Sequence, residues 1–260
     1  MSKNVYNLEG KHIVVTGASR GLGSVCAKAF SEHGARLILI ARSSEGLEEV
    51  RKSCANPEKH LSIHTDMTEL DKLQMCIHDA KNFLGEVDAV LHVAGGGLGL
   101  RDSLITAADL YKLFTLNVAA AVEINRLIAP DMIKRGKGNL VHVASISSVE
   151  ATASVGYNTV KAALAAYVRS LGNELAYSGV VVTGILPGGF YAPGNSWERL
   201  EKNKPEIVER FIQERLPRKR LAQAEEIVPL LMFLCSDAAS MMGGCLVPID
   251  AGEGRAYLVD

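Results

Sequence analysis

The sequence predicts an α/β fold in which a doubly wound, mostly parallel sheet of about seven strands carries helices on both faces. Short β-branched runs alternate with longer segments of helical spacing from end to end, and most of the short runs are continuously apolar. Continuous apolar runs are typical of parallel strands that are covered on both faces, and the repeated strand–helix–strand order indicates right-handed crossovers. A chain of 260 residues fits one domain, because a single core supports up to about 250–300 residues.

The elements can be assigned in chain order from these patterns. The strand segments are short and rich in Val, Ile and Leu, and we expect them at 12–16, 36–41, 61–66, 88–94, 139–145, 180–186 and 245–250. The helical segments repeat apolar residues every three or four positions, and we expect them at 21–33, 68–84, 107–134, 156–177 and 225–234.

The stretch 187–223 is too long for an ordinary strand–helix connection. Loops of this length usually serve a function or carry their own helices, so we expect a substrate lid (the lid segment, 187–223) within a single domain of residues 1–260. Its aromatic residues, Phe190, Tyr191 and Trp197, would form either a lid wall or the apolar underside of a short helix pair. Its basic run, 215–220, is either a solvated face or an anion site for an acidic substrate.

Composition excludes several classes of protein. Hydrophobic residues make up 48% and charged residues 22%, which is typical of a globular domain, and the net charge of −1 argues against nucleic acid or an anionic membrane as partner. No stretch reaches about 18 apolar residues and the first eleven residues lack a signal core, so we expect a soluble, cytoplasmic protein. The five cysteines form no C-x-x-C pair, so we expect them to be buried or half-buried thiols. The seven histidines form no H-x-x-x-H pair, so we expect packed or surface histidines, such as His92 and His142, and no metal site.

The stretch 16–23, TGASRGLG, follows the first expected strand and opens the first expected helix. Its glycines leave backbone N–H groups accessible, and a helix N-terminus adds about half a positive charge. In doubly wound sheets, ligands bind outside the carboxyl ends of the strands. A tight surface turn is the alternative, but this position favours a phosphate cradle for a dinucleotide.

Further motifs follow the glycine loop in order. They are Asp66 after the third expected strand, HVAG at 92–95, Asn117 in the long helix, Ser145 ending the fifth strand, YNTVK at 157–161 and PGG at 187–189. Together with the T-G-x-x-x-G-x-G spacing, they resemble the classical short-chain dehydrogenase/reductase family from Gly10 to about Gly252. The resemblance implies a Rossmann-type sheet, a nicotinamide cofactor, and a homo-oligomer (dimer or tetramer) in which the alanine-rich helix 156–177 forms part of an interface.

The resemblance also implies roles for individual residues. Tyr157 would be the general acid or base, Ser145 would polarise the substrate carbonyl, Lys161 would hold the nicotinamide ribose and Asn117 would fix a water. The cofactor-binding set would comprise Gly17, Ser19, Arg20, Gly21, Leu22, Gly23, Arg42, Asp66, Met67, Ala94, Gly95, Tyr157, Lys161, Pro187, Gly188 and Phe190. Two positions depart from the family pattern: Val93 replaces a usual asparagine, and 190–193 lacks a usual threonine.

The end of the second strand indicates which dinucleotide binds. A carboxylate there would hydrogen-bond the ribose 2′-hydroxyl of NAD(H), but residues 37–44 contain no acid. Arg42 offers a planar, permanently charged group for a 2′-phosphate, and Arg20 could supply a second. A solvated surface charge is the alternative for either arginine. The sequence therefore favours NADP(H) over NAD(H).

Tyr157 and Lys161 are four residues apart and share one face of a helix. A free tyrosine has a pKa near ~10 and is a poor base at neutral pH. An ammonium about 4 Å away at an effective dielectric near 20 contributes roughly 4 kcal/mol, or about three pKa units. We therefore expect the lysine to lower the tyrosine pKa. Among the serines of ASISS we choose Ser145 over Ser147 and Ser148, because it ends the apolar strand.

These features predict an NADP(H)-dependent oxidoreductase that interconverts a ketone and a secondary alcohol by hydride transfer, acting on a small molecule. A compact polar or acidic substrate is favoured by the basic lid segment. One alternative is a 3-oxoacyl-[acyl-carrier-protein] reductase. The other is a regulatory protein that binds the cofactor without turnover, although such a protein needs no complete set of Asn117, Ser145, Tyr157 and Lys161.

Overall fold

The computed structural model describes residues 8–256, and it confirms the predicted α/β fold class. Seven parallel strands form one sheet in the order β3-β2-β1-β4-β5-β6-β9, with the order reversing at β1. The bounds are β1 (His12–Thr16), β2 (Arg36–Ala41), β3 (Leu61–His64), β4 (Ala89–His92), β5 (Gly138–Val143), β6 (Val180–Pro187) and β9 (Leu246–Ile249).

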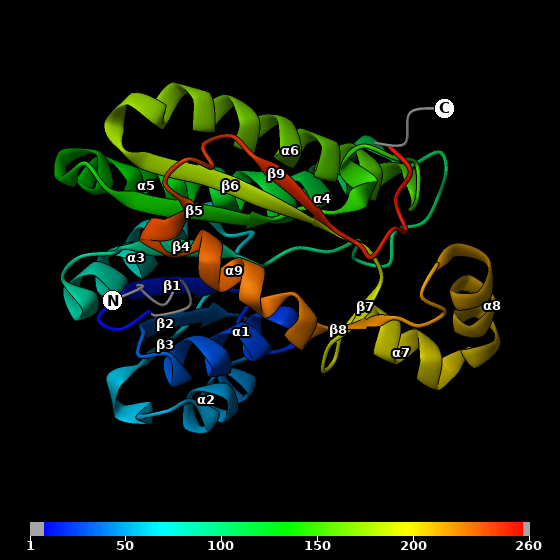
Figure 1. Ribbon diagram of the computed structural model, residues 1–260, viewed down its shortest axis with the longest axis horizontal. Coiled ribbons are helices and arrows are strands. Elements are labelled where there is room, and N and C mark those ends of the chain that lie inside the picture. The colour runs from blue at the N-terminus through cyan, green and yellow to red at the C-terminus, as the bar shows by residue number, and fades with distance from the viewer. Residues whose placement is uncertain (1–7, 257–260) are drawn as a thin grey trace.

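Helices cover both faces of this sheet (Figure 1). One core gathers side chains from α3, α5 and α6, and a second gathers them from α1, α2 and α9. The helices are α1 (Gly21–Glu32), α2 (Ser44–Ser53), α3 (Leu70–Leu84), α4 (Ala107–Phe114), α5 (Ala120–Arg135), α6 (Val155–Leu175) and α9 (Val228–Leu234). None of the helices within 8–256 is long and apolar enough to span a membrane.

Strand β1 explains why the strands read as continuous apolar runs. Val14 packs into the first core, whereas Ile13 and Val15 pack into the second, and all three are fully buried. Successive side chains of a strand point to opposite faces, so a sheet with two covered faces requires apolar residues at every position.

Several boundaries differ from the sequence-based expectation. The third, fourth and fifth strands end two residues before Asp66, Ala94 and Ser145, so these residues lie in the loops that follow. The helix expected at 107–134 is interrupted at 115–119 by a π-helical turn that separates α4 from α5. Helix α2 was not among the predicted segments; it is mostly polar and buries only Leu47, so it has few of the apolar residues from which the other helices were predicted.

The lid segment folds as two helices and a small parallel ribbon, which stand to one side of the sheet in Figure 1. These are β7 (Phe190–Tyr191), α7 (Ser196–Asn203), α8 (Pro205–Arg215) and β8 (Ala222–Gln223). Trp197 and Phe211 have ring centroids 4.3 Å apart and pack on a separate small core. For Trp197 this arrangement matches the underside of a helix pair. The role of the segment as a lid stays a prediction.

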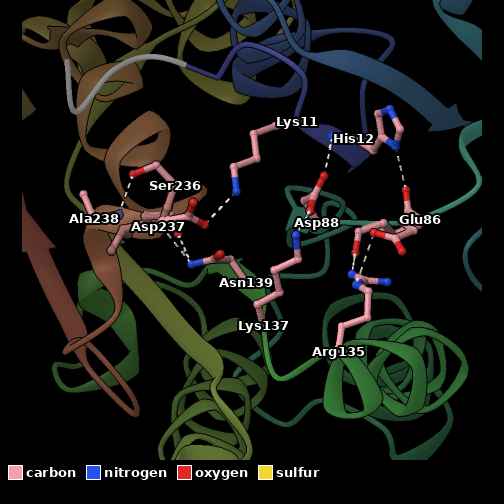
Figure 2. Close-up of polar contacts among 12 residues, drawn as sticks. Lys11, His12, Glu86, Asp88, Arg135, Lys137, Asn139, Ser236, Asp237 and Ala238 are labelled. Atoms are coloured by element: carbon pink, nitrogen blue, oxygen red, sulfur yellow. Dashed lines mark hydrogen bonds and ion pairs between the residues drawn. The ribbon is translucent and has the colours of Figure 1, made fainter. Parts of the chain in front are cut away.

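The amino ends of the central strands are tied together by polar contacts (Figure 2). Asp88 accepts a hydrogen bond from the His12 N–H at 3.0 Å, and Asn139 Nδ2 donates to the Leu234 carbonyl at 2.9 Å. Lys11 pairs with Asp237 at 2.6 Å. These contacts link the start of β1 and the residue before β4 to each other, and β5 to the end of α9.

The cysteines and buried histidines match the sequence-based expectation. Of the five cysteines, four are buried, Cys245 is half-buried, and all are free. His92 and His142 are stacked at 4.6 Å between ring centroids, and Asn125 bridges them with hydrogen bonds of 2.8 and 3.1 Å. Burial lowers the pKa of His142 to about 4. Both rings are therefore neutral packing groups at pH 7.

Candidate active site

The glycine loop connects β1 to α1 at the carboxyl edge of the sheet. Gly17 and Gly21 have φ angles of +68° and +65°, a region that favours glycine. An added Cβ at Gly17 would lie 2.8 Å from the Ala94 nitrogen, and one at Gly23 would lie 2.4 Å from the Gly17 oxygen, so both positions are needed for close packing. An added Cβ at Gly21 would meet nothing within 4 Å. That side of the loop is open to a ligand.

The lid segment reaches this loop. The Gly21 N–H donates a hydrogen bond of 2.7 Å to the Pro193 carbonyl, at the N-terminus of α1. Gly194 lies beside the Arg20 side chain, since an added Cβ there would be 3.4 Å from Arg20 Cδ. The N-terminus of α1 favours an anion, and here the Pro193 carbonyl oxygen already accepts the hydrogen bond of one of its N–H groups.

Arg42 and Asp66 lie together beyond β2 and β3. Arg42 is 57% exposed, and its Nη1 is 3.8 Å from Asp66 Oδ2. Burial raises the pKa of Asp66, but hydrogen bonds from Thr68 and the charge of Arg42 outweigh it, and the pKa lies below its ordinary value. Ala41, just before Arg42, adds no bulk or negative charge. An exposed cation therefore stands at this end of the sheet.

Asn117 and Lys161 meet at Gly95. An added Cβ at Gly95 would lie 2.8 Å from Asn117 Oδ1 and 3.4 Å from Lys161 Nζ. The π-helical turn presents Asn117 so that its side chain accepts from Gly96 N–H and donates to the Gly96 carbonyl, both at 3.0 Å. Lys161 is 4% exposed and donates to the Val143 carbonyl at 2.9 Å. Burial lowers the pKa of Lys161 to about 8.

Tyr157 lies between Lys161 and Ser145. The lysine Nζ is 5.6 Å from the centroid of the tyrosine ring. Burial raises the pKa of Tyr157 to about 12, although the nearby Ser145 side chain lowers it. The expectation that Lys161 lowers the tyrosine pKa is therefore wrong for this structure. The ammonium lies over the ring, and loss of solvent dominates the titration.

The three candidate serines differ in their contacts. Ser145 Oγ accepts from the Ser147 N–H at 3.1 Å, and the Ser145 side chain also lowers the pKa of Tyr157. Ser147 Oγ is engaged with Thr152 Oγ1 at 2.7 Å. Ser148 Oγ is buried and has no hydrogen-bond partner within residues 8–256. Of the three hydroxyls, that of Ser145 acts on the pKa of Tyr157, and the choice of Ser145 stays a prediction.

The loop after β6 carries the remaining predicted cofactor residues. Pro187 ends the strand, the Gly188 N–H donates to the Ile249 carbonyl at 3.3 Å, and Phe190 begins β7. The Gly189 N–H donates to Glu253 at 2.6 Å. Glu253 is a buried residue that sequence reasoning missed, because an acid in the glycine-flanked run IDAGEG resembles a solvated tail.

The basic run 215–220 is partly neutralised within the chain. Glu226 pairs with Arg218 at 3.1 Å and with Arg220 at 2.7 Å, and Lys219 donates to the Gln213 carbonyl. Arg218, Arg220 and Glu226 border a cavity of about 390 Å³ that reaches Gly188 and Asp250. Because one carboxylate serves both arginines, positive charge remains in this region, and a solvated face and an anion site both stay predictions for it. Within residues 8–256, no cluster of three or more His, Cys, Asp or Glu side chains could hold a metal ion.

Comparison with known proteins extends these observations. A family model described as short chain dehydrogenase matches residues 11–203. Gluconate 5-dehydrogenase of Gluconobacter oxydans (strain 621H) is 28% identical over 251 residues, which cover 96% of each chain. The crystal structure of L-sorbose reductase from Gluconobacter frateurii, complexed with NADPH and L-sorbose, superposes with a TM-score of 0.88 at 26% identity, covering 98% of this chain and 100% of that one. A 7 alpha-hydroxysteroid dehydrogenase complexed with NADH and 7-oxo glycochenodeoxycholic acid gives a TM-score of 0.88 at 27% identity, covering 97% and 98%.

Proposed function

The chain belongs to the short-chain dehydrogenase family, and from that premise we propose that it is an NADP(H)-dependent oxidoreductase that interconverts a ketone and a secondary alcohol. The observation that carries this proposal is the convergence of Ser145, Tyr157 and Lys161 beside Gly95, next to the glycine loop. A surface tyrosine–lysine pair would have neither the buried ammonium nor the serine contact.

The residues present fit a nicotinamide dinucleotide. The open side of Gly21 and the N-terminus of α1 would hold the pyrophosphate, Asp66 the adenine, and the loop 187–190 the nicotinamide end. The bound cofactor would supply or accept the hydride. Lys161, held by the Val143 carbonyl, would contact the nicotinamide ribose.

Tyr157 would transfer the proton, and Ser145 would stabilise the reacting oxygen. With a pKa of about 12, Tyr157 keeps its proton at neutral pH, so it would donate that proton to the oxygen of a ketone during reduction. Ser145 would donate a hydrogen bond to the same oxygen, where negative charge develops. In the opposite direction Tyr157 would act as the base, and it must first lose its proton.

Arg42 supports the choice of NADP(H). Its guanidinium is more than half exposed at the end of β2, beside the small Ala41, where a 2′-phosphate could approach. The two solved relatives named above carry NADPH and NADH respectively, so family membership alone does not favour either cofactor.

The proposed substrate is a compact polar hydroxy or keto compound. Gluconate and sorbose are named for two of the relatives. A steady-state panel of ketoses, keto acids, steroid ketones and a 3-oxoacyl thioester, read by nicotinamide absorbance, tests this proposal. The Tyr157→Phe variant is the control for contaminating activity. Cofactor binding without turnover of any compound would favour the regulatory alternative.

The proposal includes a homo-oligomer. Tyr111 and Phe114 of α4 and Val122 of α5 expose apolar surface, with 72% of Tyr111 accessible. Sedimentation of the purified protein tests this part separately, and a monomer at micromolar concentration would contradict it.

A further inference from the structure

Two of the Asp, Glu, Lys and Arg side chains within residues 8–256 are buried. One is Lys161 of the candidate active site, and the other is Glu253, which the proposed function does not use. Glu253 is 5% exposed and lies in the tail 250–256 that follows β9. A buried carboxylate is costly unless its surroundings compensate it, so its partners indicate its role.

The Glu253 carboxylate lies against the backbone of two glycines. Its Oε2 accepts a hydrogen bond of 2.6 Å from the Gly189 N–H, a short contact to a charged acceptor. An added Cβ at Gly188 would lie 2.5 Å from the same oxygen. On the other side, an added Cβ at Gly189 would lie 2.7 Å from Leu221 Cδ2 and 3.1 Å from Phe211 Cε1. The Gly189 peptide is thus held between a carboxylate and apolar side chains of the lid segment.

The same tail is anchored beside the catalytic serine. Glu150 Oε1 accepts from the Arg255 N–H at 2.5 Å and from the Ala256 N–H at 2.8 Å. Glu150 lies two residues after the short helical turn that begins directly behind Ser145. The tail therefore bridges the loop that follows Ser145 and the loop that contains Gly189, with Glu253 as its buried contact.

The charges around Glu253 come from three segments. Burial raises its pKa most; Arg215 at the end of α8 lowers it, and Asp250 and Glu150 raise it. The result is a pKa above that of an ordinary glutamate. The ionised carboxylate is the stronger acceptor for the Gly189 N–H, so the contact weakens as this group takes up a proton.

We propose that Glu253 is a positioning residue that fixes the Gly188–Gly189 peptides for the reaction. It acts through the backbone of the loop 187–190, to which the proposed function assigns the nicotinamide end of the cofactor. The inference rests on that proposed function for its effect on the reaction, whereas the hydrogen bond itself does not depend on it.

The test compares Glu253→Ala and Glu253→Gln with Glu214→Ala, which removes an exposed glutamate from α8. Three quantities are measured on the intact protein: hydrogen–deuterium exchange of a peptide that spans 187–190, the Kd of NADPH and NADH by fluorescence, and the melting temperature. We expect Glu253→Ala to speed exchange at Gly189 and to weaken dinucleotide binding about tenfold or more. Glu253→Gln, whose amide oxygen can still accept the bond, should bind the dinucleotides more tightly than Glu253→Ala. We expect the affinity of the wild type to decrease at acidic pH as Glu253 takes up a proton, and Glu253→Gln should not show this decrease.

Each outcome decides between a positioning and a merely structural role. Unchanged exchange at Gly189 in Glu253→Ala would refute the contact, whether or not the protein binds a dinucleotide. A lowered melting temperature with unchanged exchange, Kd and pH profile would assign Glu253 to stability alone. If the wild type binds neither cofactor, the proposed function fails, while the exchange experiment still decides the positioning of Gly189.

Discussion

Replacing Arg42 by alanine should reduce the preference of this protein for NADPH. The guanidinium is 57% exposed, so solvent screens its attraction for a 2′-phosphate. We expect Arg42→Ala to raise the Kd of NADPH and to leave the Kd of NADH almost unchanged, because only NADPH carries the phosphate.

The magnitude follows from two opposing contacts. A charge-assisted hydrogen bond contributes about 1.5–3 kcal/mol. Asp66, 3.8 Å from Arg42, competes for the same guanidinium. At this separation two unit charges attract by about 1 kcal/mol in bulk water. The net loss should therefore be about 0.5–2 kcal/mol, or roughly two- to thirtyfold in the affinity for NADPH.

The assay is fluorescence titration of both cofactors at one fixed salt concentration. Arg42→Lys keeps the charge but loses the planar pair of donors, and should fall between wild type and Arg42→Ala. Lys52→Ala, which removes an exposed cation from the last turn of α2, is the control for general electrostatics. Equal weakening of NADPH and NADH, or a wild type that prefers NADH, would refute the assignment of Arg42.

Three further predictions concern the catalytic residues and the sheet. Tyr157→Phe should reduce kcat by about 100-fold or more and leave cofactor Kd within about twofold, because only the proton donor is lost; a wild-type kcat would exclude Tyr157. Ser145→Ala should reduce kcat more than Ser147→Ala, because Ser145 acts on the pKa of Tyr157 whereas Ser147 Oγ is engaged with Thr152; equal losses in steady-state assays would contradict this ranking. The buried His142 has its pKa lowered to about 4 from 6.5, so the unfolded chain binds this proton first as the pH falls. The free energy of unfolding should therefore decrease between pH 6.5 and about 4, by about 3 kcal/mol from this group, and denaturant titrations of His142→Asn should show a flatter decrease.

The sequence predicted the sheet well because both of its faces are covered. Fully buried strands leave apolar runs that stand out between helices, as β1 and β6 illustrate. Asp66, Ala94 and Ser145 were placed correctly at the carboxyl edge, although the strands end before them. A residue that directly follows a parallel strand lies at the carboxyl edge of the sheet, even where the hydrogen bonds between the strands end two residues before it.

Other features left no readable pattern in the sequence. Helix α2 buries only Leu47 and is otherwise mostly polar, so it has few apolar residues from which a helix could be predicted. The tyrosine pKa depends on how much solvent the folded chain excludes, and spacing to Lys161 alone cannot supply that quantity. Glu253 is buried only because the tail turns back under Gly189, a contact between residues 64 positions apart.

The π-helical turn at 115–119 accommodates one extra residue within a continuous helix. Such a turn completes one rotation with one more residue than an α-helical turn, so the flanking segments keep their phase. Helix α4 therefore still faces α6, and α5 still faces α3. Deleting one residue at 115–119 would give a regular helix with both faces in place, but it would remove the wider turn that carries Asn117. A single-residue deletion here should therefore harm the candidate active site more than the packing of the helix.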